Sequence, residues 1–507
     1  MVRKRFRRPR WLSRSLHRWF GLFVGPLWAI WAASGLVLNH RAAVAHWSIP
    51  RRWLPAAYRW NNWNLGAIRG GRVEPDGSVL VWGNIGIWRT DGTWSTWKEQ
   101  MEGLPAGVDA RRTFAVVRSP AGHLYAGSQS GLYRFDTAKQ RWTVIPCPSR
   151  DPRICDLVPA PDGVIAVARD ELFHLRDDAP HPVPRRIRLE PAADDDGRVS
   201  LFRLLWHLHS GELFGGLGVA LMDFVALVVI ALVVTGWLYF LVPRWIRRRV
   251  RAGRPATQLG RLARPLTRWH RRLGALTALA LGISALTGSV LRPPLLIPIA
   301  GRRVPPPIGT WMAGPNRWAD RLRALAPLPS GDWVLATDEA LFRVRADFSG
   351  RPVRWEGGPP LSVMGVNVLM PAGGDALLVG SFAGLFVWRP ELGWSCDYFT
   401  GLTPSSGGAQ LRRPIGDHLI SGLVRLPDQT LVFDYSRGLL NANVPMPREM
   451  DAIGLPIWNL AQEIHTGRFF QRWLGPAYVL LVPLLGLAAV VIVLAGVRVW
   501  WPARTPL

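Results

Sequence analysis

The sequence predicts a membrane α-helical bundle of four helices, arranged as a tandem two-helix repeat, together with an outer all-β, propeller-like domain built from two inserts. Three observations support this fold class: four long apolar runs, basic clusters beside them, and strand pairs that recur between turn residues. The chain has 507 residues, of which 49% are hydrophobic and 19% charged, and its net charge is +27. Such a composition excludes a largely disordered chain.

Four apolar runs are long enough to cross a bilayer at about 1.5 Å of rise per residue. They are Trp19–Leu38, Leu213–Val242, Leu273–Leu291 and Trp473–Val497. Asp223 is the one acidic residue within them. A carboxyl at such a position is either a proton or quinol contact or a hydrogen-bonding partner for a neighbouring helix.

The positive charge is concentrated beside these runs. Eight basic residues lie within residues 1–20, eleven arginines lie within residues 241–272, and Arg498 and Arg504 follow the last run. Nucleic-acid binding is the alternative explanation, but arginines adjoining apolar runs of membrane length are better explained as topology determinants and contacts to anionic lipid. We therefore expect membrane lipid as a partner and no nucleic acid.

The same charge bias predicts the topology, because Lys and Arg favour the cytoplasmic side of short loops. Both termini are expected in the cytoplasm and both long inserts outside it, in a multi-pass protein of a bacterial-type inner (plasma) membrane. The predicted segments are a basic N-terminus with the first membrane helix (1–43), a β insert of three blade-like repeats (44–203), the second membrane helix (204–243), a basic cytoplasmic loop (244–268), the third membrane helix (269–292), a second β insert of three repeats (293–460), and the fourth membrane helix with the C-terminal tail (461–507).

An internal duplication relates the helices. Residues 16–21 (LHRWFG) resemble residues 269–274 (WHRRLG), and residues 208–214 (LHSGELF) resemble residues 464–470 (IHTGRFF). Two membrane passes per half give both copies the same orientation, so a pseudo-twofold axis along the membrane normal should relate them. Equivalent residues then face one another at equal depth. This predicts two histidine pairs, His17 with His270 at the cytoplasmic ends and His209 with His465 at the outer ends.

The inserts repeat at a finer scale. Each contains three copies of one pattern: a turn, an apolar strand, a small or polar break, and a second apolar strand, recurring every 40–54 residues. This spacing is typical of propeller blades, and three blades cannot close a ring. The simplest closed arrangement is one six-bladed propeller assembled from both inserts, and two separate small β domains are the alternative.

The cysteines leave two alternatives open. Cys147 and Cys155 lie in one short loop and can bridge in an oxidising compartment, whereas Cys396 has no such neighbour. Three unpaired thiols are the other possibility. The absence of a CxxCH motif excludes covalently attached c-type haem.

The repeated histidines suggest a cofactor. Neutral imidazole is a good axial ligand for haem iron, and two of them leave no open position for oxygen. Glycines follow each histidine, and on a straight helix His17, Gly21 and Gly35 would share one face with room for a flat macrocycle. The alternative is that the repeated motifs are helix-start and packing signatures. Zinc is disfavoured because no Cys, Asp or Glu stands at ligand spacing, and the neighbouring candidates His40, His46 and His207 have no copy in the other half.

The motifs LHRWFG…SG, LHSGELF…TGW, WHRRLG…TG and IHTGRFF…AG resemble the PepSY-associated transmembrane family over the four helices. Some members of that family are inner-membrane ferric-siderophore reductases that carry electrons through haem b held between helices by histidines. The resemblance implies that the haem-iron ligands are His17, His270, His209 and His465. Neither insert contains a recognisable PepSY module, so the substrate of those relatives cannot be transferred to this chain.

The expected function is transmembrane electron transfer through bis-histidine haem b to an outer acceptor, either a ferric chelate or a protein partner. The chain has no dinucleotide-binding glycine loop, and its inner loop is too short for a nucleotide domain, so the donor would be a quinol or a redox protein. The alternative is a non-enzymatic, membrane-anchored propeller that serves as a sensor or scaffold for a ligand or protein. No hydrolase motif of the GxSxG or HExxH type occurs, and no catalytic residue is assigned.

Overall fold

The computed structural model describes residues 10–178, 182–255, 257–362, 365–404 and 416–500. The chain divides into two compact units. The helical unit comprises residues 1–44, 197–314 and 458–507, and the β unit comprises residues 45–196 and 315–457. Some of the basic residues predicted to mark the cytoplasmic side lie outside the described residues: Arg3, Lys4, Arg5, Arg7, Arg8 and Arg504.

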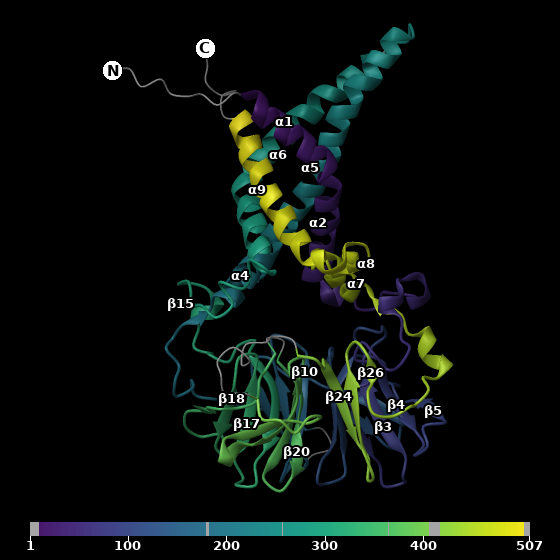
Figure 1. The fold of residues 1–507 in the computed structure, drawn as a ribbon, viewed down its shortest axis with the longest axis vertical. Coiled ribbons are helices and arrows are strands. Elements are labelled where there is room, and N and C mark those ends of the chain that lie inside the picture. The colour runs from purple at the N-terminus through teal and green to yellow at the C-terminus, as the bar shows by residue number, and fades with distance from the viewer. Residues whose placement is uncertain (1–9, 179–181, 256, 363–364, 405–415, 501–507) are drawn as a thin grey trace. The chain divides into compact units, whose positions relative to one another are not determined.

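Long helices form the helical unit (Figure 1). They are α1 (Arg10–Phe23), α2 (Gly25–Asn39), α5 (Gly215–Arg251), α6 (Thr257–Val290) and α9 (Leu481–Trp500). Helix α5 packs on α2 and α6, and α9 packs on α6 and α1. The short helices α4 (Leu201–Ser210) and α7 (Ile457–His465) precede α5 and α9, and α4 also contacts α6.

Three helical segments are long and apolar enough to cross a membrane: Glu212–Arg251, Thr257–Val290 and Arg468–Trp500. A further span is present if the bent pair Trp11–Phe23 and Gly25–Asn39 is counted as one. The apolar run Trp19–Leu38 therefore does not form the single straight helix expected from its length, because the two parts meet at 59°. Pro26 follows the break, and a proline lacks the N–H that would continue the helical bonding and clashes with the preceding turn.

The basic segment between the second and third spans is mostly helical. Helix α5 continues to Arg251 and α6 begins at Thr257, so only a short turn remains of the predicted loop 244–268. Figure 1 shows this end of the α5–α6 hairpin extending past α1 and α9. The arginines of this segment are thus arrayed on helices rather than on a flexible loop.

Six groups of antiparallel strands form the β unit, three from each insert. The first insert contributes β2 (Gly70–Val73), β3 (Val79–Gly83), β4 (Gly86–Thr90) and β5 (Trp97–Glu99); β6 (Thr113–Arg118), β7 (Leu124–Ser128), β8 (Gly131–Asp136) and β9 (Arg141–Ile145); and β10 (Ile154–Ala160), β11 (Gly163–Ala168), β12 (Leu172–Arg176) and β13 (Arg185–Ile187). The second contributes β16 (Leu322–Pro327), β17 (Trp333–Thr337), β18 (Leu341–Val344) and β19 (Val353–Arg354); β20 (Val366–Gly373), β21 (Ala376–Ser381), β22 (Gly384–Arg389) and β23 (Trp394–Asp397); and β24 (Ile420–Arg425), β25 (Thr430–Asp434) and β26 (Gly438–Leu439).

The first strands of these groups contact one another in succession. Strand β2 contacts β6, β6 contacts β10, β10 contacts β16, β16 contacts β20, and β20 contacts β24. Strand β24 then pairs in parallel with β2, with Leu423 opposite Gly70. The succession returns to its start, so the two inserts meet twice, at β10–β16 and at β24–β2. This parallel pairing joins the first and last groups into one seven-stranded sheet.

The second strand of each group explains why the groups pack together. Strands β3, β7, β11, β17 and β21 are buried along their whole length. Their sequences are continuous apolar or small-residue runs, as expected for strands covered on both faces rather than one. Burial of each Val, Leu or Ile side chain contributes about 1.5–3 kcal/mol, so contact between neighbouring groups provides most of their stability.

All three cysteines, Cys147, Cys155 and Cys396, are free thiols in the structure. Of the two alternatives that the sequence left open, the structure therefore contains the unpaired one.

Candidate functional site

The structure brings the four repeated histidines together as two pairs. His17 of α1 and His270 of α6 have ring centroids 6.1 Å apart and ring planes at 83°. His209, near the end of α4, and His465, at the end of α7, have centroids 5.9 Å apart and planes at 52°. Each pair combines equivalent residues from the two halves, in the arrangement expected from the duplication.

The two pairs lie far apart along the helices. On α6, His270 belongs to the first pair, whereas Gly288, eighteen residues later, contacts His209 of the second pair. Eighteen residues span about 27 Å of helix axis, which approaches the thickness of a hydrocarbon core. The pairs are therefore located near opposite ends of one membrane-length helix.

The Nδ1 atoms have partners in every case. His17 Nδ1 lies 3.2 Å from the Ile492 carbonyl oxygen, His209 Nδ1 lies 3.0 Å from that of Ser284, and His465 Nδ1 lies 3.2 Å from that of Trp31. A carbonyl oxygen only accepts, so these three Nδ1 atoms carry the proton.

His270 reaches the same tautomer through a hydroxyl group. Its Nδ1 lies 2.9 Å from Thr235 Oγ1, and that hydroxyl donates its own proton to the Ala231 carbonyl at 2.7 Å. Thr235 Oγ1 therefore accepts from His270. With all four Nδ1 atoms protonated, the lone pair is on Nε2, and in the described part of the chain no hydrogen bond involves any of these four Nε2 atoms.

Each imidazole also lies against a glycine from the other half of the chain. A Cβ built on Gly288 would lie 2.8 Å from His209 Cε1, and one on Gly496 would lie 3.1 Å from His17 Cε1. At Gly35 and Gly236 the corresponding distances, to Cε1 of His465 and His270, are both 3.5 Å. Absence of a side chain at these glycines lets a neighbouring helix approach the ring.

These contacts correct the expected role of the glycines. Gly35 shares no face with His17, because the helix bends between them, and it packs against His465 instead. Gly211 and Gly467 have φ values of +84° and +79°, and they end the short helices that carry His209 and His465. Left-handed backbone at a helix end favours glycine. The sequence signal for the true contacts was the repeated dipeptide SG, TG, TG and AG, which precedes each ring contact.

The ring separations fit one metal ion between each pair. A metal–imidazole nitrogen bond measures about 2.0 Å, so two rings that ligate one ion from opposite sides have centroids roughly 6 Å apart. Both observed distances have this value. Among the described residues, no group of three or more His, Cys, Asp or Glu side chains is arranged to hold a metal ion. The two-histidine pattern therefore suits a group that supplies the remaining ligands itself, as a porphyrin does.

The other candidate histidines are engaged differently. His207 Nδ1 lies 2.9 Å from Glu212, and its ring packs on Trp311 at 4.8 Å. His46 packs on Trp47. His40 Nε2 lies 2.7 Å from Asp223 of α5. None of the three contacts its counterpart in the other half, in agreement with the absence of a copy in the sequence.

Asp223 thus has two partners within the helical unit. Besides His40, it accepts a hydrogen bond of 3.0 Å from Asn39 Nδ2. Asn39 Nδ2 is also 3.4 Å from the carbonyl oxygen of Ser210, the residue after His209. The side chains of Asp223 and His40 are 18% and 52% exposed, so the carboxylate is shielded while the imidazole is accessible at the surface of the helices.

Comparison with known proteins identifies one family. A family model described as the PepSY-associated TM region matches residues 14–503. Comparison with curated proteins finds no match.

Solved structures share only distant similarity with the chain. The extracellular domain of a protein described as a hybrid two component system from B. thetaiotaomicron matches at 10% identity and a TM-score of 0.35, over 73% of this chain and 32% of that one. PorZ, described as a surface component of the type-IX secretion system of Porphyromonas gingivalis, matches at 11% and 0.33, over 73% and 37%. A protein described as a gluconolactonase matches at 12% and 0.34, over 76% and 92%. The chain thus spans about a third of the first two proteins, and these TM-scores support no functional argument.

Proposed function

The chain belongs to the PepSY-associated TM region family, and from that premise we propose that it carries electrons across a membrane through haem b held by two histidine pairs. The observation that supports this most directly is the repeated geometry of His17 with His270 and of His209 with His465. Both ring separations, 6.1 and 5.9 Å, suit two axial ligands of one iron.

The residues around each pair have a defined role in this proposal. When bound, haem b with two imidazole ligands supplies reversible one-electron transfer and no open position for oxygen. Thr235 and the Ile492 carbonyl fix the tautomer and orientation of the inner pair. Gly236 and Gly496 allow close helix approach to the same rings. Such hydrogen-bonded support typically changes ligand affinity by 10–100-fold.

Charge distribution supports a topology with both termini in the cytoplasm of a bacterial-type cell and both inserts outside. The arginines at the ends of α5 and α6 would then face the cytoplasm and anionic lipid. Four spans are required, so the bent pair α1–α2 would count as one of them. The cyclic succession of strand contacts, from β2 round to β24 and back, supports one six-bladed propeller as the form of the β unit.

The donor in this proposal is a quinol or a redox protein, and the acceptor is an outer ferric chelate or a protein. The contact between His40 and Asp223 favours quinol. A quinol releases a proton with each electron, and an accessible imidazole backed by a shielded carboxylate is a suitable proton acceptor. Asn39 connects this pair to the backbone beside His209.

The test is haem content and spectrum of the purified protein in detergent. We expect about two haem b per chain and a low-spin reduced-minus-oxidised spectrum. Two double variants, His17→Ala with His270→Ala and His209→Ala with His465→Ala, should each lose one haem. His40→Ala is the matched control and should retain both, because His40 has no paired ring. A colourless preparation that is well folded would overturn the proposal.

The second candidate function is a membrane-anchored sensor or scaffold without redox activity. It is favoured by the size of the β unit, which has hydrophobic cores of its own. In that case the duplicated histidines serve helix packing, and the alanine variants would change stability without changing any visible absorbance.

A further inference from the structure

We propose that the β unit binds an oxygen-rich anion, a polycarboxylate or phosphate, at a ring of arginines where the first strands begin. The arginine ring consists of Arg69, Arg112, Arg153, Arg169, Arg321 and Arg323. The proposal is independent of haem.

The repeat places these arginines at one register. In four of the six groups, the residue directly before the first strand is an arginine: Arg69 before β2, Arg112 before β6, Arg153 before β10 and Arg321 before β16. The fifth and sixth groups have Gly365 and Leu419 at this position. No helix cap or turn requires arginine here, so its recurrence in four groups needs another explanation.

Contacts between groups show that these strand starts are neighbours. The Arg69 guanidinium lies 5.1 Å from the ring of Phe114, the second residue of β6. The amide of Leu325 in β16 donates to Asp156 of β10 at 3.0 Å. Asn367 of β20 donates to the carbonyl oxygen of Ile420, where β24 begins, at 2.8 Å. The starting ends of successive first strands therefore lie side by side, and the arginines with them.

Arg323 occupies the place that the fifth group leaves open. It is the second residue of β16, and its side chain runs toward Gly365. A Cβ on Gly365 would lie 2.8 Å from Arg323 Cγ, and Gly365 has a φ of +90°. Glycine at this register therefore makes space for the arginine of the neighbouring group.

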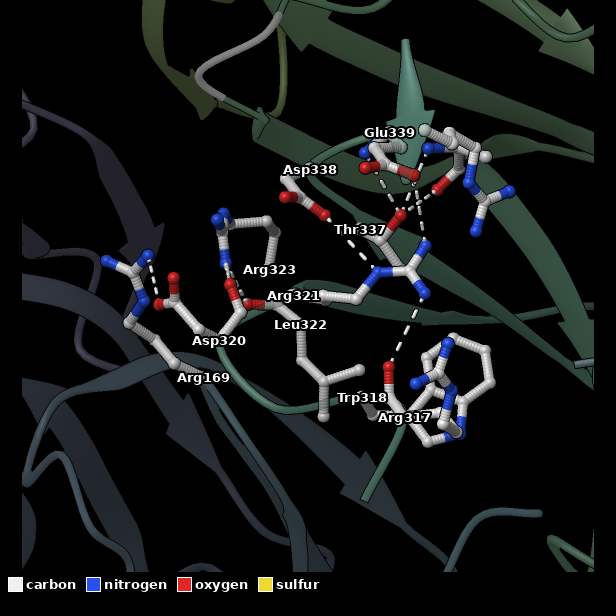
Figure 2. Close-up of polar contacts among 12 residues, drawn as sticks. Arg169, Arg317, Trp318, Asp320, Arg321, Leu322, Arg323, Thr337, Asp338 and Glu339 are labelled. Carbon is white, nitrogen blue, oxygen red and sulfur yellow. Dashed lines mark hydrogen bonds and ion pairs between the residues drawn. The ribbon is translucent and has the colours of Figure 1, made fainter. Parts of the chain in front are cut away.

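Most of the arginine ring is held by local carboxylates. Arg112 lies 3.4 Å from Asp109, Arg153 lies 3.3 Å from Asp151, and Arg321 lies 3.7 and 3.3 Å from Asp338 and Glu339. Figure 2 shows Arg169 paired with Asp320, which lies between Arg169 and Arg323. These ion pairs fix the guanidinium groups in position.

Arg69 and Arg323 differ from the others because neither has a carboxylate partner among the described residues. Arg323 Nη1 donates only to the backbone carbonyls of Asp320 and Leu322, at 3.1 and 2.9 Å, and Arg69 Nε is buried without a hydrogen bond. Loss of water lowers the pKa of both guanidinium groups. An arginine stays charged at neutral pH, so each is a partly desolvated cation that lacks a counter-charge.

Cys155, the second residue of β10, marks the point on which the arginines converge. Burial raises the pKa of its thiol, and the charges of Arg153, Arg169 and Arg323 oppose that rise. The thiol also raises the pKa of Arg69. A neutral thiol supplies no counter-charge, so the convergence of four guanidinium groups around it leaves room for an external anion.

Guanidinium chemistry identifies the class of ligand. The planar fork of arginine matches two oxygens of a carboxylate or a phosphate, and such charge-assisted pairs are about twice as strong as neutral hydrogen bonds. Two cations without a counter-charge suit a ligand that carries at least two negative charges. Citrate and inorganic phosphate both have this chemistry, and comparison between them distinguishes a polycarboxylate ligand from a phosphate ligand.

The experiment is calorimetric titration of the full-length protein in detergent with citrate and, separately, with inorganic phosphate. The wild type should bind one of them with a stoichiometry of one and more weakly at high salt. Arg69→Gln and Arg323→Gln should each weaken binding by at least tenfold, the loss typical of one charged hydrogen bond. Arg425→Gln is the matched control, because Arg425 is exposed at the opposite end of a first strand, and binding should be unchanged.

Conservative variants separate binding from folding. Arg69→Lys and Arg323→Lys retain the charge but lose the planar fork, so we expect intermediate affinity with an unchanged thermal midpoint. The proposal is wrong if the wild type binds neither anion, or if the Gln or Lys variants bind as tightly as the wild type. Haem content is measured on the same samples, so failure of the electron-transfer proposal leaves this result interpretable.

Discussion

Gly288 and His209 are in contact so close that a single added methyl group would enter the imidazole, since a Cβ at Gly288 would lie 2.8 Å from His209 Cε1. Alanine normally stabilises a helix interior by about 1 kcal/mol relative to glycine. We predict the reverse for Gly288→Ala, because the ring of His209 must shift away from His465. If the pair holds haem, this variant should lose the absorbance of one haem, measured as haem per chain.

Two other glycines provide controls. Gly282 lies on the same helix, and a Cβ added there would have no atom within 4 Å, so Gly282→Ala should retain full absorbance. Gly35→Ala should be mild, since its Cβ would lie 3.5 Å from His465, an ordinary contact distance. Equal losses in all three variants would contradict the proposed contact, because the effect would then follow helix composition rather than distance.

Thr235 should matter more for its hydroxyl than for its shape. Its Oγ1 accepts from His270 Nδ1, whereas His17 relies on a backbone carbonyl that no side-chain change removes. Thr235→Val keeps the volume and removes the acceptor, so we expect haem affinity at this pair to fall by about 10–100-fold. Thr235→Ser should bind like the wild type. Identical haem affinities of the Val and Ser variants would show that the hydroxyl has no orienting role.

The His40 and Asp223 pair predicts a separation of two rates. Asp223→Asn should slow reduction of the protein by a quinol by at least about tenfold, because the proton acceptor loses its charged partner. Reduction by dithionite, which delivers no proton, should be unaffected. Glu212→Gln is the matched control, since Glu212 forms the other histidine–carboxylate contact, with His207, at 2.9 Å. A decrease in both variants, or in neither, would argue against a quinol site at Asp223.

The duplication made the histidine pairs predictable, whereas their surroundings were not. Repeated motifs identify which residues are equivalent, and twofold symmetry then requires His17 and His270 to face one another. Periodicity along one helix cannot show which neighbouring helix a residue contacts. Gly35 was therefore assigned to the face of His17, although it packs against His465. The bend before Pro26 was missed for a related reason, since the apolar run continues through it.

In the inserts, the strand pairs could be located from turn residues and apolar runs, because these signals are local. The parallel pairing of β2 with β24 could not, since Gly70 and Leu423 are far apart in sequence and neither carries a marker of the contact. The recurrence of arginine before four of the first strands is visible in the sequence only after the strand starts are known.

Asp156 predicts a pH dependence of the β unit. Loss of water around its carboxyl raises the pKa to about 7, despite hydrogen bonds from the amides of Leu325 and Leu157. In the unfolded chain the pKa is about 3.9. Below that value the carboxyl is protonated in both states. Between about pH 4 and 7 only the unfolded chain ionises, so the stability of the β unit should fall as pH rises, by at most about 4 kcal/mol.

The measurement is the thermal midpoint of the tryptophan fluorescence transition at pH 5 and at pH 8. The wild type should be less stable at pH 8. Asp156→Asn cannot ionise and retains one of the two acceptor oxygens, so it should be less stable than the wild type at pH 5 yet lose less stability between the two pH values. Other titrating groups act equally on both proteins, and the difference between their pH dependences therefore isolates Asp156. Equal pH dependence in the two proteins would mean that Asp156 is already ionised in the folded state at pH 5.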